Sequence, residues 1–228
     1  MIDSRRTTGS RKGIPLAKKE LFRGSWDLPL AQEGVEDAIR VGEATKGVWD
    51  TIYHSNLGRT TRTAKCVQQF SPDAELIPTS KLRPMHLGAI EGKEVNTERI
   101  RDMNEILRDT PSKPLPGISS KSDEPGESLN SFRFRVLKFL KKVEDELKPN
   151  ERILLVTHYR DIQLVKSYLS LAEPPDFGID VEMLLKKGSQ KPGDLFWFDL
   201  ENRSLNASDD AKKKGLYLMR HGKTAANA

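Results

Sequence analysis

The spacing of apolar residues predicts helices and strands that alternate along most of the chain. Apolar side chains recur at helical spacing from residue 30 to residue 41, and in residues 127–148 they share one face of a long helix. WDTIYHS has the β-branched and aromatic content of a buried strand, and ERILLVTH is a near-continuous apolar run, typical of a parallel strand covered on both faces. Further helices are expected in NLGRTTRTAKCVQQF, near residues 98–107 and in DIQLVKSYLSLA, and further strands in AELIPTS, DLFWFDLE and LYLMRH.

This alternation predicts an α/β fold with a mostly parallel central sheet flanked by helices. DLFWFDLE is expected at or near the sheet edge because its character alternates, and NRSLNASDDAKKKG is expected to be a polar linker. Residues 1–20 are polar, basic and aperiodic. We therefore expect a flexible basic N-terminal arm in residues 1–20 and a single domain in residues 21–228.

Composition indicates a globular protein without a membrane segment. The chain is 36% hydrophobic and 31% charged, and no apolar run approaches the roughly 20 residues that span a bilayer. The N-terminus lacks the apolar core of a secretory signal, so we expect a cytoplasmic protein. The single cysteine, Cys66, excludes an intramolecular disulfide and a cysteine-rich zinc site, and its helical context predicts a small buried residue.

The chain is weakly basic, with 38 Lys and Arg against 33 Asp and Glu and a net charge of +5. The positive charge is dispersed, which is typical of solvated lysines on a surface. The basic arm could contact nucleic acid or a partner, or fold over a pocket as a lid. No aromatic residue interleaves with its charges, so base stacking has no support, and we expect no nucleic-acid partner.

Histidine and arginine follow three of the predicted strands. They are His54 and Arg59, His158 and Arg160, and His221 with Arg220 directly before it. Reactive groups collect beyond the carboxyl ends of parallel strands, so these side chains are expected to converge. Histidines and arginines without a cysteine cluster fit phosphate chemistry better than metal binding, because guanidinium groups match phosphate oxygens and histidine can carry a phosphoryl group. Gly222 would allow the backbone to approach the phosphate closely.

The segment RHGKTAAN resembles the RHG-x-T-x-x-N signature of the histidine phosphatase superfamily, which includes the phosphoglycerate mutases. Five further segments resemble other elements of that family: FRGSWDLPLAQEG, YHSNLGRTTRTA, LRPMHLGAIEG, PGES and LLVTH. The resemblance extends from about residue 22 to residue 227 and implies a three-layer fold of the phosphoglycerate mutase type. It further implies a phosphatase that needs neither metal nor cofactor.

The resemblance also implies roles for particular residues. His221 would be the nucleophile that forms a phosphohistidine, while Arg220, Arg59 and His158 would surround the phosphoryl oxygens. The substrate-binding residues implied are Asn227, Arg23, Gly24, Gly222 and Thr224. Glu127 and Ser128 could belong to the site or could equally cap the long helix. His54 and His86 are candidates for the pocket rim.

The family elements stand in an unusual order along this chain. In the family RHG comes first, directly before the G-x-x-D-x-P-L element, whereas here RHG comes after all the others. We interpret this order as a circular permutation in which the former ends are joined through NASDDAKKKG. The alternative, a tandem protein cut inside a second copy, predicts another RHG near the N-terminus, and MIDSRRTTGSRKG contains none.

One member of the implied site is missing. The mutase-like branch places a glutamate that protonates the leaving oxygen where this chain has Pro84, and another branch places an aspartate where this chain has Tyr159. A general acid typically contributes about 10²–10⁴-fold. Glu91, Asp161 and His86 could replace it, and the sequence does not choose among them.

We therefore expect a metal-independent phosphatase that hydrolyses a small phosphomonoester. The alternatives are a catalytically weak or inactive phosphate-binding protein and a phosphoglycerate mutase-type phosphotransferase. The expected partner is a small phosphorylated substrate, with no membrane contact, and the sequence leaves both a monomer and a homodimer open.

Overall fold

The computed structural model of this protein describes residues 21–117, 125–171, 177–186, 188, 190–199, 202 and 204–225. The basic arm, residues 1–20, and Asn227 lie outside the described residues, so their expected roles stay predictions. Within the described part of the chain, no helix is both long and apolar enough to cross a membrane.

A six-stranded mixed sheet forms the centre of the fold, in the order β2-β1-β3-β6-β4-β5. Its parallel strands are β2 (Glu75–Thr79), β1 (Thr51–Ser55), β3 (Arg152–Thr157) and β6 (Gly215–Arg220). The strand β4 (Leu195–Asp199) pairs antiparallel with β6, and β5 (Ser204–Ser208) pairs antiparallel with β4. The expected α/β fold with a mostly parallel sheet is confirmed.

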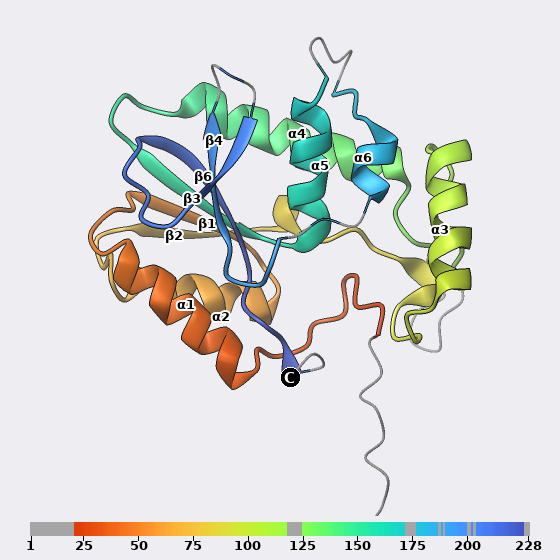
Figure 1. Ribbon diagram of the computed structural model, residues 1–228, viewed down its shortest axis with the longest axis horizontal. Coiled ribbons are helices and arrows are strands. Elements are labelled where there is room, and N and C mark those ends of the chain that lie inside the picture. Colours follow the sequence, from red (N-terminus) through yellow and green to blue (C-terminus); the bar gives the residue numbers. More distant parts are fainter. Residues whose placement is uncertain are drawn as a thin grey trace, which may run out of the picture.

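Helices cover both faces of this sheet, which makes three layers (Figure 1). The helices α1 (Gln32–Ala44) and α2 (Gly58–Gln68) lie on one face, and α4 (Leu129–Glu146) and α5 (Tyr159–Leu169) lie on the other. The helix α3 (Thr97–Asp109) and the short α6 (Val181–Leu185) lie toward one end of the sheet (Figure 1). Two short 3-10 turns, Ser80–Leu82 and Gly88–Ile90, precede α3.

Each face of the sheet has its own apolar core. In β6, Leu216 and Leu218 contribute to the core under α4 and α5, whereas Tyr217 and Met219 contribute to the core over α1 and α2. All four side chains are at most 2% exposed. This double burial explains why LYLM reads as an uninterrupted apolar run, because neither face of the strand meets water.

The prediction was wrong at one edge of the sheet. The segment expected to be a polar linker contains β5, which pairs with β4 from Leu195↔Ser208 to Asp199↔Ser204. The strand β5 is therefore the edge strand, and β4 lies directly beside it, near the edge as expected. The sequence SLNAS lacks an apolar alternation because its side chains lie mostly at the surface, and pairing with β4 imposes the extended conformation.

Candidate active site

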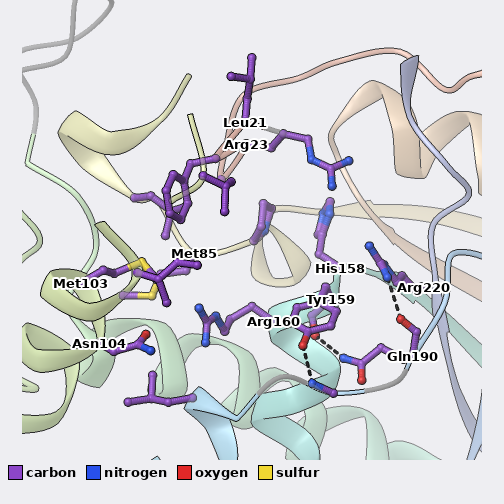
Figure 2. Close-up of a pocket in the computed structure, with 18 of the residues that line it drawn as sticks. Leu21, Arg23, Met85, Met103, Asn104, His158, Tyr159, Arg160, Gln190 and Arg220 are labelled. Atoms are coloured by element: carbon purple, nitrogen blue, oxygen red, sulfur yellow. Dashed lines mark hydrogen bonds between the residues drawn. The ribbon is translucent and has the colours of Figure 1, made fainter. Parts of the chain in front are cut away.

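A cavity of about 500 Å³ opens at the carboxyl ends of β3 and β6. Its walls come from the loops at residues 21–24 and 84–87, from α2 and α3, from the start of α5 and from the end of β6. It is lined by most of the expected site residues: His221, His158, Arg59, Arg220, Arg23 and Gly24. Figure 2 shows His158 and Arg220 close together at one end of this cavity, with Arg23 above them.

His221 follows the last residue of β6, and its backbone N–H donates to the carbonyl oxygen of Thr157 in β3. Its side chain is 5% exposed, and Nδ1 lies 2.6 Å from the carbonyl oxygen of Gly222. A carbonyl oxygen only accepts, so Nδ1 carries the proton and Nε2 holds the lone pair. Burial lowers the pKa of His221 well below its ordinary value, and the charge of Arg59 lowers it further. The ring is therefore a neutral base whose Nε2 can act as a nucleophile.

His158 is the neighbouring ring, with its centroid 5.1 Å from that of His221 and an angle of 65° between the planes. Its Nδ1 lies 3.3 Å from Nη2 of Arg59. A guanidinium only donates, so Nδ1 accepts and the proton of His158 is on Nε2. Nε2 is buried and has no hydrogen-bond partner among the described residues. Burial lowers the pKa of His158 well below its ordinary value, which keeps this ring neutral too.

Arg59 is anchored in α2 and is only 2% exposed. It donates from Nη1 to the carbonyl oxygen of Trp26 at 2.7 Å and from Nη2 to that of Gly24 at 3.0 Å. Burial lowers the pKa of Arg59 to about 10, which still leaves it charged at neutral pH. Asp27 Oδ1, 3.8 Å from Nη1, is exposed and shields this charge only partly.

Arg220 and Arg23 add two further positive charges to the cavity. Arg220 donates to the carbonyl oxygen of Gln190 at 2.7 Å, and its guanidinium lies 5.2 Å from the centre of the Tyr159 ring. Arg23 donates to the hydroxyl oxygen of Thr224. Arg59, Arg220 and Arg23 together give the end of the cavity around the two histidines a strong affinity for anions.

Three of the expected substrate-binding residues, Gly24, Gly222 and Thr224, form hydrogen bonds that support the site. Gly24 lines the cavity, but its carbonyl oxygen accepts from Arg59. Gly222 orients His221 through its carbonyl oxygen and donates its N–H to Thr63 Oγ1. Thr224 is fully buried and accepts from Arg23. Neither Gly222 nor Thr224 is among the described residues that line the cavity, so their binding roles stay predictions.

Pro84 lies in the cavity wall, at the position where the family resemblance implies the acid. Glu91 lies behind the wall, and its oxygens accept from the N–H groups of Ser25 and Leu87 and from the Ser25 hydroxyl, all at 2.8 Å. His86 has its Nδ1 3.2 Å from the carbonyl oxygen of Pro125. The carboxylate of Glu91 therefore links the loop at Ser25 to the loop at Leu87.

Asp161, the third acid candidate, is 1% exposed, and neither of its oxygens has a hydrogen-bond partner among the described residues. Burial raises the pKa of Asp161 well above its ordinary value, against the opposing charge of Arg135. No candidate acid of the three is among the described residues that line the cavity.

The other sequence candidates have structural partners. Ser128 caps α4, because its side chain accepts from the N–H of Ser131. Glu127 pairs with Arg135 at 2.8 Å. The Nδ1 of His54 is held by the carbonyl oxygen of Ser55 at 2.8 Å. Cys66 is buried as expected.

Sequence reasoning missed the part of the cavity that is remote from the histidines. Its wall is largely apolar, and the side chains that form it come from separated segments: Phe22, Met85, Leu87, Val95, Ile100, Met103 and Leu185. The sequence predicts a helix near residues 98–107, but nothing in the pattern shows that its apolar side chains line a cavity. Among the described residues, no group of three or more His, Cys, Asp or Glu side chains could hold a metal ion.

Comparisons with known proteins agree with this fold. The probable phosphoglycerate mutase GpmB of Salmonella paratyphi C (strain RKS4594) is 30% identical over 141 residues, which are 60% of this chain and 61% of that protein. The chain thus spans less than two thirds of the length of the curated relatives it matches. Bacillus stearothermophilus YhfR has a TM-score of 0.61 at 21% identity, covering 85% of this chain and 89% of the other.

A crystal structure of the alpha-ribazole phosphatase from Shigella flexneri has a TM-score of 0.56 at 19% identity, covering 86% of this chain and 90% of the other. The family match itself extends over residues 11–184 and ends before β6, so it is independent of the RHG motif. Because it spans most of the sequence, the chain belongs to the histidine phosphatase superfamily (branch 1).

Proposed function

We propose that this protein is a metal-independent phosphatase that hydrolyses a small phosphomonoester through a phosphohistidine on His221. The observation that carries the proposal is the pairing of His221 with His158, 5.1 Å apart and in opposite tautomers. Arg59, Arg220 and Arg23 line the same cavity and would neutralise the phosphate.

In the first step, Nε2 of His221 attacks phosphorus in line with the ester oxygen. The N–P bond forms while the P–O bond breaks, and the electron pair of that bond leaves with the ester oxygen. The N–H at Nε2 of His158 donates to a phosphoryl oxygen, and the guanidinium groups stabilise the charge spread over the other oxygens. Both rings must be neutral for this step, which their lowered pKa values favour.

In the second step, water attacks the phosphohistidine and the N–P bond breaks, which releases inorganic phosphate and returns His221 to its starting state. The proton that this water loses balances the proton that the leaving oxygen takes up. One water is consumed for each ester hydrolysed, and the positive field of the arginines acts again on the phosphoryl oxygens.

Protonation of the leaving oxygen is the weak part of this mechanism. Pro84 has no proton to give, and the carboxylate of Glu91 is held by Ser25 and Leu87. We infer that the enzyme acts best on esters whose leaving oxygen is stable without a proton, such as aryl phosphates.

Turnover of p-nitrophenyl phosphate in the presence of EDTA tests the proposal directly. We expect turnover by the wild-type protein and none by His221→Ala. The absence of turnover on this ester and on a panel of phosphorylated metabolites, with no difference between wild type and His221→Ala, would refute it.

A second candidate function is phosphate-ligand binding with weak or no catalysis, and the observation that favours it is Pro84 in the cavity wall. Phosphorylated ligands would then raise the melting temperature without any phosphohistidine accumulating. Trapping acid-labile, base-stable phosphate on His221 would exclude this function.

A mutase-type phosphotransferase is the third candidate, and the similarity to a protein named as a probable phosphoglycerate mutase favours it. Such an enzyme would return the phosphoryl group to another oxygen of the product instead of water. Isomerisation of 3-phosphoglycerate without release of phosphate would identify it.

We also propose that the chain is a circular permutant of the family fold. The support is that residues 223–225 run antiparallel beside residues 29–31. The carbonyl oxygen of Lys223 accepts from the N–H of Ala31, and the N–H of Ala225 donates to the carbonyl oxygen of Pro29. A chain reopened in the loop at residues 209–214, with residue 228 joined to residue 21 through a short linker, should keep the fold and the activity. Loss of the fold for every linker length would contradict the permutation.

A further inference from the structure

We propose that the cavity holds a second anion-binding subsite centred on Arg160, so that the substrate carries a further anionic group separated from its phosphate by an apolar body. This inference rests on the proposed function, because it extends the substrate of the same cavity. It concerns the end of the cavity away from His158 and Arg220.

The cavity is larger than a phosphate group requires. At about 500 Å³ it falls within the range of sites that enclose whole organic ligands. The side chains beyond the histidines are mostly apolar, and Phe22, Met85 and Met103 are each at most 8% exposed. A wall of this kind favours an apolar or aromatic group next to the phosphate, since burial of apolar surface stabilises its complex.

Arg160 brings a positive charge into this apolar end. It is the second residue of α5 and is partly buried. Figure 2 shows its side chain extending from beside Tyr159 toward Asn104, away from Arg220. Its Nη1 donates to the carbonyl oxygen of Leu184 at 3.2 Å. Among the described residues, no carboxylate forms an ion pair with it.

The buried position of Arg160 disfavours its charged form. Burial lowers the pKa of Arg160, and the neighbouring Tyr159 opposes this effect without reversing it. A guanidinium has five N–H donors, and the carbonyl oxygen of Leu184 engages Nη1 alone. An anion that enters the cavity would supply both the missing charge and the missing acceptors.

Asn104 and Lys186 extend the same end of the cavity. The side-chain oxygen of Asn104 is buried and accepts no hydrogen bond within the described part of the chain. Because the two amide atoms are interchangeable by rotation, this side chain can offer an N–H to a bound anion. Lys186 is exposed at the cavity wall and adds a second positive charge.

The charges of the cavity are too many for one phosphate. Among its described lining residues are Arg23, Arg59, Arg160, Lys186 and Arg220, and none is an Asp or Glu. A phosphomonoester carries about two negative charges near neutral pH. Three of the five cations suffice for it, so Arg160 and Lys186 remain for a carboxylate or a second phosphate on the same molecule.

A matched pair of substrates tests this subsite. One is an aryl phosphate that carries a propanoate chain opposite the phosphate, and the other is its primary amide. The methylene groups insulate the ring, so the two leaving groups have nearly the same basicity, and only the remote charge differs. A third compound with a phosphonate in place of the carboxylate separates the two kinds of anion.

We expect wild-type kcat/KM to be about 10-fold to 100-fold higher for an anionic compound than for the amide. Arg160→Gln should reduce this ratio to about one by lowering kcat/KM for the anions only, while Arg160→Lys should retain part of it. Arg101→Gln is the matched control, because it removes one charge from an exposed position of α3 outside the cavity, and it should leave the ratio unchanged.

The same comparison is made by calorimetry with non-hydrolysable difluoromethylphosphonate analogues, which needs no turnover. If the analogues bind with the expected preference but no ester is hydrolysed, the proposed function fails and the subsite stands. Equal affinity for the anions and the amide in wild type, or an unchanged ratio in Arg160→Gln, would overturn the subsite while leaving the phosphatase proposal intact.

Discussion

The rings of His158 and His221 meet edge to face with their centroids 5.1 Å apart, and their Nδ1 atoms have opposite roles. Nδ1 of His221 donates to the carbonyl oxygen of Gly222, whereas Nδ1 of His158 accepts from Arg59. The lone pair of one ring and the proton of the other are therefore both on Nε2. This pairing supports the proposed roles of His221 as the nucleophile and of His158 as a hydrogen-bond donor to the phosphate.

Replacement of the two histidines should separate these roles. In His221→Gln we expect no phosphoenzyme, because glutamine cannot attack phosphorus. In His158→Gln the nucleophile remains and the amide still donates to the phosphoryl oxygen, so a phosphoenzyme should form at a rate lower by about 10²-fold. The measurement is acid-labile, base-stable label after a quench with a radiolabelled ester. Label on His221→Gln would show that another residue is the nucleophile.

Both histidines should titrate below their ordinary pKa of 6.5, because burial and nearby arginines disfavour the charged rings. Proton NMR of the ring signals checks this directly. Arg59→Gln removes the largest single charge acting on both rings, so their pKa values should rise and the acid limb of kcat/KM should move to higher pH. Arg59→Lys keeps the charge and should move neither. Ring signals that titrate above pH 6.5 in wild type would contradict the proposed neutral state.

Pro84→Glu should supply the missing acid. We expect a gain on the order of 10²-fold in kcat for alkyl phosphates, which need protonation of the leaving oxygen, and little change for p-nitrophenyl phosphate. The measurement is the dependence of kcat on the basicity of the leaving group, which should be steep in wild type and shallow in the variant. Pro84→Gln is the control, because glutamine has nearly the size of glutamate but no acidic proton. It should leave the slope as in wild type. A shallow slope in wild type would mean that an acid is already present.

Much of this fold followed from the sequence because its strongest signals have a direct physical cause. LYLM and ILLV are apolar throughout because β6 and β3 are covered on both faces, and the long helix at residues 129–146 shows one apolar face because the other meets water. The strand β5 could not be found this way, since its side chains contribute little to either core and only its pairing with β4 makes it a strand.

The candidate site, like the fold, could be predicted from the sequence only in part. His54 lies near the end of β1, and His158 and His221 directly follow β3 and β6. Only the last two line the cavity, because Nδ1 of His54 is directed to the backbone of its own strand end. Spacing along the chain shows which strand end carries a residue but not the direction of its side chain. The place of Arg160 depends on α6 lying beside α5 and α3 lying beside α6, a tertiary arrangement that no local pattern encodes.

Asp161→Asn should stabilise the protein increasingly as the pH rises. The raised pKa of Asp161 means that, above its ordinary value of 3.8, the folded protein keeps a proton that the unfolded chain has released. The contribution of Asp161 to the free energy of unfolding therefore falls as the pH rises toward the folded-state pKa. Urea unfolding of both proteins from pH 4 to pH 8 measures the difference. A variant that is destabilised equally at every pH would instead show that the Asp161 side chain acts through packing or a neutral hydrogen bond.

Gly222→Ala should lower both stability and turnover, for a reason that the sequence did not indicate. A Cβ at this position would lie 2.1 Å from the carbonyl oxygen of Gly34 in α1, and backbone atoms cannot move aside as the end of a side chain can. Glycine is thus required after His221 because the backbone at this position passes close to α1. We expect a loss of about 1–3 kcal/mol in the free energy of unfolding. Turnover should fall as well, because the displaced carbonyl oxygen of Gly222 no longer orients Nδ1 of His221.

Gly58→Ala is the control, because its added Cβ would meet only the end of the Asp27 side chain, at 3.1 Å. It should cost little stability and leave turnover nearly intact. Gly34→Ala makes the reciprocal collision, 2.1 Å from the carbonyl oxygen of Lys223, and should reproduce the loss of stability. Urea unfolding and kcat on p-nitrophenyl phosphate are measured for all three. If Gly222→Ala unfolds like wild type, the backbone contact between α1 and the residues after β6 does not hold the nucleophile in place, and Gly222 would instead be required by the bound phosphate.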